Sequence, residues 1–229
     1  MHVPDAFLDA PTSVATGVVA VAGVAIALRR SRGDLDDRVA PLAGLVATFI
    51  FAAQMLNFPV AGGTSGHLLG GALAAVLVGP WTATLVMTVV LLIQALVFAD
   101  GGLTALGTNV TLMGLVGVWV GYGVFRLARR ALPRRTASVP VAAAIGAFVS
   151  VLAAAAVFAA LFLVGGTAPL EADTLFGAML SWHALIGLGE AVITFLVVSA
   201  VVSVRPDLVH GARDLTALPH PAPAEEAAR

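Results

Sequence analysis

The longest uncharged stretch of this chain decides what it can fold into. Between Val39 and Phe125, Asp100 is the only aspartate, glutamate, lysine or arginine. Over all 229 residues, 59% are hydrophobic and 11% are charged, against about 25% charged in soluble domains. A helix needs about 20 apolar residues to cross the hydrocarbon of a bilayer. We therefore expect an all-α fold, a polytopic bundle of membrane helices.

Seven apolar segments predict the membrane helices. They cover roughly 12–29, 39–57, 66–79, 81–99, 105–128, 139–164 and 181–204. The third is too short to span cleanly, and it lies between the glycine-rich stretch 62–66 and Gly79-Pro80. Irregular backbone at membrane depth is tolerated only where protein or a cavity surrounds it, and short segments of this kind point to a transporter's binding site.

The basic residues predict the orientation. All twelve are arginines, and with seven crossings they all fall on one side of the membrane. The positive-inside rule makes that side cytoplasmic, so we expect the N-terminus outside and the C-terminus inside. Residues 205–229 are rich in proline, alanine and glutamate and are expected to form a disordered cytoplasmic tail.

The residue types that are missing exclude several chemistries. Without cysteine there is no disulfide, thiolate metal site or cysteine nucleophile. Without lysine there is no Walker A lysine and no Schiff base. The start does not read as a signal peptide either, because residues 1–11 contain Asp5 and Asp9 but no arginine.

The first two residues, Met1 and His2, form a possible chelator. The terminal amine, the His2 backbone nitrogen and its Nδ1 can close a five- and a six-membered ring on one metal ion. One position of a square plane stays open, and all-nitrogen tetragonal ligation suits Ni(II) or Cu(II) and, by extension, Co(II). An α-amine with a pKa of about 7.7–8.0 can lose its proton to a metal near neutral pH. The alternative is a disordered chain start with a chance histidine.

His67 is the candidate for the fourth ligand. It follows the glycine-rich stretch at the entrance of the short third segment, where backbone can approach closely. Pro4 keeps the N-terminal segment extended, and ten residues can reach about 33–36 Å, enough to fold back into the bundle. The alternative is a histidine that merely bonds to a neighbouring carbonyl.

Other polar residues near the same side are weaker candidates. Glu190 falls near mid-membrane, where an ionisable group is a functional candidate, although we favour a helix-packing role for it. One alternative is that His183 and Trp182 are an interfacial pair with no further role, and another is that Asn57 and Asn109 staple helices together. The residues that could orient the ligands by hydrogen bonds are Asn57, Asp100, Asn109 and His183.

Several motifs together resemble a known family. They are residues 1–8 (MHVPDAFL), 54–60 (QMLNFPV), 63–70 (GTSGHLLG), 99–107 (ADGGLTALG) and 183–187 (HALIG). They are similar to the CbiM/NikM family, the substrate-binding (S) membrane components of energy-coupling-factor (ECF) transporters for cobalt or nickel. The resemblance covers about residues 1–204. One departure is Ala6, where the family pattern has glycine. A methyl group there should be tolerated unless the backbone needs a positive φ.

The resemblance implies a site and a set of partners. The Met1 amine, the His2 nitrogens and His67 would bind the ion in a nearly planar four-nitrogen site. The partners would be a transmembrane coupling (T) component, two cytoplasmic ATPase subunits and often a small accessory membrane protein. We thus expect one transmembrane domain, residues 1–204, that begins with a metal-binding segment, residues 1–11.

The resulting hypothesis is a metal-capture subunit of an ATP-driven cobalt or nickel importer in a prokaryotic cytoplasmic membrane. It would be no enzyme, use no catalytic cofactor and bind no nucleic acid. A self-contained secondary transporter or channel is the main alternative, but it would usually place several acids across the membrane, and Glu190 alone makes a thin path. An intramembrane metal-dependent hydrolase lacks its His-Glu-x-x-His motif. The pattern does not distinguish cobalt from nickel.

Overall fold

The first long helix, α1 (Ala10–Arg30), shows how the sequence sets the ends of the bundle's helices. Asp9 caps it by accepting a hydrogen bond from the Thr12 N–H at 2.9 Å, and Pro11 stands in the first turn. Arg29 and Arg30 occupy the last turn, where the negative end of the helix favours positive charge. This computed structural model describes residues 1–33, 37–59 and 65–216.

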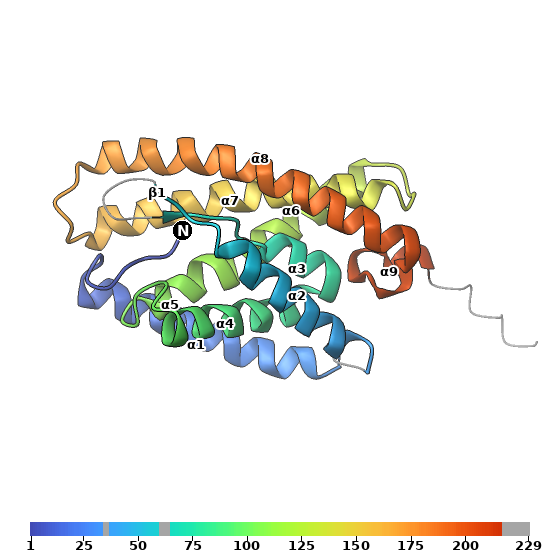
Figure 1. Cartoon of the computed structure of the whole chain (residues 1–229), viewed down its shortest axis with the longest axis horizontal. Coiled ribbons are helices and arrows are strands. Elements are labelled where there is room, and N and C mark those ends of the chain that lie inside the picture. Colours follow the sequence, from blue (N-terminus) through green and yellow to red (C-terminus); the bar gives the residue numbers. More distant parts are fainter. Residues whose placement is uncertain (34–36, 60–64, 217–229) are drawn as a thin grey trace, which may run out of the picture.

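The remaining elements follow α1 in the order seen in Figure 1. Two short antiparallel strands pair Phe58 with Gly66. The helix α5, the π-helical stretch η2 and α6 form one continuous helix of 26 residues. The elements are η1 (Ser31–Gly33), α2 (Val39–Gln54), β1 (Phe58–Pro59), β2 (Ser65–Gly66), α3 (Gly71–Val78), α4 (Pro80–Val97), α5 (Leu106–Asn109), η2 (Val110–Gly117), α6 (Val118–Ala131), α7 (Ser138–Gly165), α8 (Ala172–Val204), η3 (Pro206–Leu208), η4 (His210–Ala212) and α9 (Arg213–Thr216).

The helices have the length and composition of a multi-pass membrane protein. In the described part of the chain, five are long and apolar enough to cross a bilayer: α1, α4, the continuous helix α5–α6, α7 and α8. The apolar helix α2 has 16 residues and α3 has eight. The all-α class is therefore confirmed, apart from the two-residue strands, whereas the count of seven spans and the orientation of the termini stay predictions.

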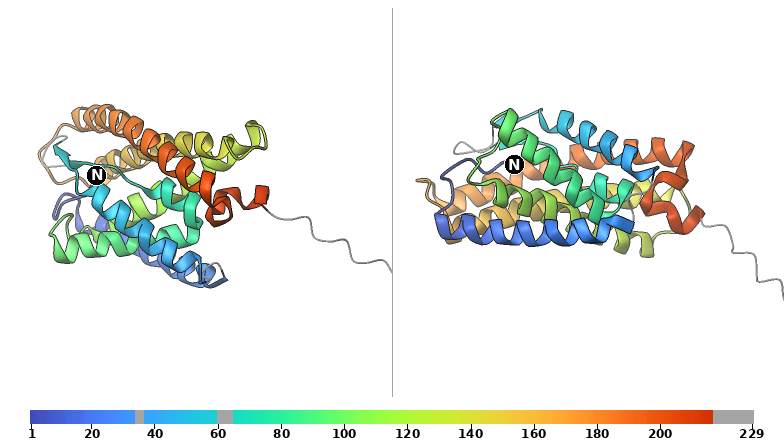
Figure 2. Two further views of the ribbon diagram at one scale, coloured as in Figure 1. Left: turned by 45° about the vertical axis from the view of Figure 1, so that its right-hand side comes forward. Right: turned by 90° about the horizontal axis from the view of Figure 1, so that it is seen from below.

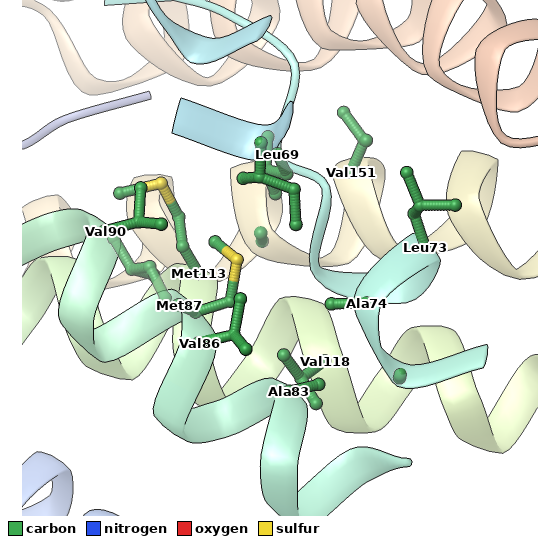
Figure 3. Packing of buried hydrophobic residues seen from close by; sticks show 14 of the residues in the cluster. Leu69, Leu73, Ala74, Ala83, Val86, Met87, Val90, Met113, Val118 and Val151 are labelled. Atoms are coloured by element: carbon green, nitrogen blue, oxygen red, sulfur yellow. The ribbon is translucent and has the colours of Figure 1, made fainter. Parts of the chain in front are cut away.

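The short helix α3 lies in the middle of the bundle. All eight of its residues are buried, and it contacts α2, α4, α6, α7 and α8. Gly70 and Gly79, with φ of 79° and 87°, bound it, and Pro80 starts α4 at once. Figure 3 shows Ala74 of α3 pointing toward buried side chains of α4 and η2, among them Met87 and Met113. The third segment is thus internal, as predicted, but shorter than 66–79.

The two ends of the bundle differ. One end gathers the N-terminus, the β1–β2 pair, the turn after α4 and the α7–α8 connection, whereas the other holds the arginine-rich helix ends (Figures 1 and 2). Between them, large apolar side chains stand exposed on the outer faces, among them Val21, Leu45 and Leu96. An apolar girdle of this kind suits contact with lipid.

Two predicted boundaries differ from the structure. The last long helix begins at Ala172 and not at 181, because the mostly apolar residues 172–180, with Asp173 in the first turn, are helical as well. The segment predicted to be a disordered tail from 205 begins with ordered structure, the short turns η3 and η4 and the helix α9, in which Val209 and Ala212 are fully buried. The rest of the predicted tail, residues 217–229, lies outside the described residues. Residues 60–64, which include the first part of the glycine-rich stretch 62–66, also lie outside them.

Candidate metal centre

The N-terminal strap, residues 1–8, enters the bundle instead of hanging free. Met1, His2 and Val3 are 1%, 4% and 1% exposed. Asn109 holds the main chain of Val3 from both sides: its Oδ1 accepts from the Val3 N–H at 2.7 Å, and its Nδ2 donates to the Val3 carbonyl at 3.2 Å. Gly102 N–H donates to the same carbonyl at 3.0 Å. The start of the chain is therefore fixed in place, contrary to the alternative of a disordered terminus.

Further contacts anchor the rest of the strap. The Asp5 carboxylate accepts two hydrogen bonds from Thr104, from its N–H at 2.8 Å and from its hydroxyl at 2.5 Å. These bonds lower the pKa of Asp5, so the carboxylate stays charged at neutral pH. The Phe7 carbonyl accepts from the Thr167 N–H at 3.1 Å, and the Phe7 ring packs on Phe158 and Phe162. Both ends of the strap are thus tied to connections between helices.

His67 lies directly beside His2. The two rings stack with their centroids 4.6 Å apart, and His67 is fully buried. Its Nδ1 is 2.8 Å from the Leu68 carbonyl oxygen, which can only accept, so Nδ1 carries the proton and Nε2 presents a lone pair. That Nε2 is buried without a hydrogen-bond partner. The predicted bond to a neighbouring carbonyl is therefore present, and it leaves the other nitrogen available as a ligand.

A chain of buried amides reaches His2 from the His67 loop. The Leu69 carbonyl accepts from Gln54 Nε2 at 2.6 Å, so Gln54 presents its oxygen to Gln94 Nε2, at 2.9 Å. Gln94 then presents its own oxygen to Nε2 of His2, at 3.2 Å. An oxygen there requires the His2 Nε2–H to donate, and in the neutral ring this leaves the lone pair on Nδ1. The Gln54–Gln94 relay thus selects the tautomer that a chelate through Nδ1 needs.

Asp100 faces the nitrogen that the relay leaves unprotonated. Its Oδ1 is 3.2 Å from Nδ1 of His2, which has no hydrogen-bond partner. An aspartate carboxylate carries a negative charge at neutral pH. A carboxylate and a nitrogen lone pair repel each other unless a cation lies close to both. Asn57 Nδ2 is 3.5 Å from the other Asp100 oxygen, at the exposed edge of the site.

The terminal amine belongs to the same cluster. Burial lowers its pKa well below the usual value, although Asp100 and Glu190 oppose the shift. Burial also lowers the pKa of His2, against the opposing influence of Asp100. Because a group with a lowered pKa holds its proton less tightly, a metal ion competes with few protons for these nitrogens at neutral pH.

His183 is buried inside the bundle and does not lie at its lipid-facing surface. It is fully buried in α8, whereas the neighbouring Trp182 is 44% exposed, so the two side chains do not form the suggested interfacial pair. Its Nδ1 is 2.8 Å from the Met179 carbonyl oxygen and its Nε2 has no partner. His183, His2 and the terminal amine are all close enough to His67 to act on it electrostatically.

Glu190 holds the loop that carries His67. Its two carboxylate oxygens accept from the Leu69 N–H at 2.6 Å and from the Gly70 N–H at 2.9 Å. These groups precede the first turn of α3, where a negative charge is favoured. The contacts tie α8 to α3, which agrees with the packing role expected for Glu190.

The motifs did not reveal the relay. Gln94 and Gln54 were not among the predicted site residues, although both are fully buried. The available signal was their polarity, since each is an amide in an otherwise apolar helix, α4 or α2, and polar groups inside membrane helices seek partners.

Side chains alone do not complete a metal site here. Within the described residues, no group of three or more histidine, aspartate or glutamate side chains is arranged to hold an ion. A ligand set at the strap therefore needs main-chain nitrogen, which the buried amine and the His2 backbone can supply. Nitrogen-rich ligation of that kind favours late transition metals over magnesium or calcium.

Comparison with known sequences decides the family. Residues 2–208 match the family described as "CbiM: Cobalt uptake substrate-specific transmembrane region". The chain belongs to the CbiM family. A CbiM-family relative from Haloquadratum walsbyi, named a putative metal transport protein, is 40% identical over 209 residues, which are 91% of this chain and 93% of that protein.

Other CbiM relatives carry names for nickel transport. A putative fused nickel transport protein NikMN from Archaeoglobus fulgidus is 43% identical over 217 residues, which are 91% of this chain and 68% of the relative. A crystal structure of a truncated transition metal transporter has the same fold, with a TM-score of 0.79 and 32% identity, and covers 89% of this chain and 99% of the other. This chain is accordingly a multi-pass cobalt/nickel transport membrane protein of the CbiM family, not an enzyme.

Proposed function

We propose that this chain is the metal-capture S component of an ATP-driven ECF importer. Its ligands for Co(II) or Ni(II) are the Met1 amine, the backbone nitrogen and Nδ1 of His2, and Nε2 of His67. The supporting observation is the convergence of the buried amine, the unpartnered Nδ1 and the unpartnered Nε2 on stacked histidine rings. The captured ion is the cargo.

The surroundings of the four nitrogens support the same proposal. The Gln54–Gln94 relay puts the His2 proton on Nε2, and the Leu68 carbonyl puts the His67 proton on Nδ1. Asp100 supplies negative charge beside the chelate, which offsets part of the charge of a divalent ion in a buried site. His183, with its free Nε2, stands ready to hydrogen-bond a group next to the ion.

The orientation and the partners form part of the proposal. The strap end faces outside and the arginine-rich end faces the cytoplasm. The chain has no lysine, and therefore no Walker A lysine, so in this proposal two separate subunits hydrolyse ATP and a coupling component links them to release inside. A small accessory membrane protein is a further partner. Relatives named for fused nickel transport and for cobalt transport both occur, so either metal fits.

Uptake measurements separate this proposal from a secondary transporter. Cells that make this chain alone are compared with cells that also make the coupling component and both ATPases, using radioactive cobalt or nickel. We expect uptake only in cells that make all four subunits. Uptake should be lost when the Walker A lysine of each ATPase is substituted. Uptake by this chain alone, driven by an ion gradient, would instead establish the secondary transporter.

Metal analysis identifies the cargo. The chain is purified after growth in equal trace amounts of cobalt and nickel, and its metal content is measured. We expect close to one transition-metal ion per chain in the native protein and none in a variant extended before Met1. Equal metal content in the native protein and in the extended variant would mean that the ion does not bind at the Met1 amine.

A further inference from the structure

A second site lies at the arginine-rich end of the bundle, away from the strap. It is a cavity of about 740 Å³ between the end of α6, the turn into α7 and the segment η4–α9 that follows α8. In Figure 1 these elements lie at the opposite end of the long axis from the N-terminus. The metal proposal uses none of the cavity's residues.

The charge of the cavity is strongly positive. Among the described residues, Asp214 is the only acid in the lining, and it already accepts from Arg129 Nη2 at 3.3 Å. Arginine guanidinium groups present planar pairs of N–H donors that match the oxygens of a phosphate group. The arginines that line the cavity are Arg126, Arg129, Arg130, Arg134 and Arg213.

Arg129 is the arginine in this lining whose side chain is largely buried while one of its guanidinium nitrogens lacks a hydrogen-bond partner. The Arg129 side chain is 9% exposed, and its Nη1 has no hydrogen-bond partner, although Nη2 is paired with Asp214. A buried charged donor without a partner costs free energy, since it has lost its water and gained nothing in return. Nη1 is shielded from the cavity, so an oxyanion there would reach it only after a shift of the Arg129 side chain, whereas the exposed guanidinium groups of Arg126 and Arg130 are accessible in the cavity lining.

The position of the cavity indicates which kind of anion this is. It lies at the last turn of α6, where a membrane helix meets the headgroup layer. Leu127, on the same turn, is 62% exposed and lies between exposed Arg126 and Arg130 in the sequence, so an apolar side chain is available to lipid beside the cavity arginines. A phospholipid has an apolar part, its acyl chains, and an anionic part, its headgroup phosphate. An exposed apolar side chain next to an arginine-lined cavity can contact both parts.

We propose that this cavity binds the headgroup of an anionic phospholipid, with the phosphodiester on the arginines and the acyl chains along the outer face of α6 at Leu127. Basic pockets between membrane helices are known to bind anionic headgroups. The lipid proposal depends on the location of the chain in a membrane and not on its cargo. It can therefore fail while the metal proposal holds, and the metal proposal can fail while the lipid proposal holds.

The test measures lipid binding by thermal unfolding of the full-length protein in an uncharged detergent. The probe is dioctanoyl phosphatidylglycerol, compared with dioctanoyl phosphatidylcholine and with inorganic phosphate, and the midpoint of unfolding is followed against probe concentration. We expect phosphatidylglycerol alone to raise the midpoint. The variant Arg126→Gln/Arg130→Gln should weaken this binding about 30-fold, at the usual contribution of a basic residue near a charged membrane surface.

A matched control removes the same charge at the same end. Arg29→Gln/Arg30→Gln changes two exposed arginines in the last turn of α1, outside the cavity, and should bind phosphatidylglycerol like the wild type. Neither double variant should change metal affinity. If the control loses as much binding as the cavity variant, the effect is diffuse surface charge and the proposal is wrong.

Other occupants would overturn the proposal in distinct ways. Equal protection by phosphatidylcholine would mean that only the apolar face binds, and equal protection by inorganic phosphate would assign the cavity to a free anion. Binding that appears only in Glu225→Gln/Glu226→Gln would show that the chain's own acidic C-terminus occupies the cavity. Absence of phosphatidylglycerol binding, together with loss of co-purifying partner subunits in Arg126→Gln/Arg130→Gln, would assign it to a protein partner.

Discussion

At the bend of the N-terminal strap, Ala6 adopts a left-handed backbone conformation, with φ of 57°. Ala99, in the turn next to the strap, does the same with φ of 52°. Each costs an L-residue about 1–2 kcal/mol relative to an ordinary conformation. Glycine, which the sequence resemblance leads us to expect at position 6, takes a positive φ without strain.

Replacing either alanine by glycine should therefore stabilise the protein. We expect Ala6→Gly and Ala99→Gly each to raise the midpoint of thermal unfolding by about 2–4 °C, for a gain of about 1 kcal/mol. The control is Ala22→Gly, at an exposed position inside α1, where glycine should lower the midpoint because a helix interior needs no positive φ and glycine is a poor helix former. A decrease at position 6 would show that flexibility in the strap costs more than the strain it relieves.

Single-residue changes also separate the two buried histidines. His67→Ala removes one of four ligands and should weaken nickel binding by about 100-fold or more, whereas His183→Ala should weaken it about 10–100-fold. Four in-plane nitrogens make Ni(II) diamagnetic and yellow-orange, so the absorption spectrum should change in His67→Ala and persist in His183→Ala. Equilibrium titration with spectra checks both. The reverse result would assign the fourth ligand to α8.

At the scale of elements, the relay connects α2, α4 and the His67 loop to the strap. Gln54→Leu or Gln94→Leu should each leave the His2 tautomer unselected and reduce metal affinity about 10–100-fold. Because the amides act as one chain, the double variant should be little worse than either single variant. Metal titration of all four proteins checks this, with Thr82→Val as the control.

Thr82 is a suitable control because it lies on α4, is buried, and has no hydrogen-bond partner for its hydroxyl. Thr82→Val should therefore leave metal affinity unchanged. Additive losses in the Gln54→Leu/Gln94→Leu protein would mean that the two amides act separately and that the relay does not set the tautomer.

The sequence predicted the elements better than the contacts between them. Apolar runs located the long helices, because the bilayer demands such runs whatever the fold, and the motif at residues 1–8 located the strap. The relay was missed, since the pairing of Gln54 with Gln94 depends on how α2 packs on α4. The burial of Val209 was missed for the same reason, because the segment that contains it packs on α3, which is far away along the chain.

At the scale of the whole molecule, burial of the strap changes how metal binding depends on pH. A peptide of residues 1–8 exposes its amine, which is protonated below a pKa of about 8, so its metal affinity falls about tenfold per pH unit below that point from this group alone. In the protein the pKa of the amine lies well below its usual value, so the affinity should hold until the pH falls through that lowered pKa.

The measurement is the nickel affinity of the protein and of the peptide between pH 8 and pH 6. Both lose the same backbone amide proton on chelation, so the difference between their profiles reports on the amine and the imidazoles. We expect the peptide's profile to be steeper by about one power of ten per pH unit. Parallel profiles would mean that the amine is not shielded from water in the working protein.

The central claim is that a free, buried Met1 amine is a metal ligand, and one protein tested in two states decides it. A cleavable leader is placed before Met1, and cobalt or nickel affinity is measured by equilibrium titration before and after a protease restores Met1 as the first residue. We predict binding weaker by about 100-fold or more before cleavage and full recovery afterwards, with the helical bundle folded throughout. Equal affinity before and after cleavage would contradict the account.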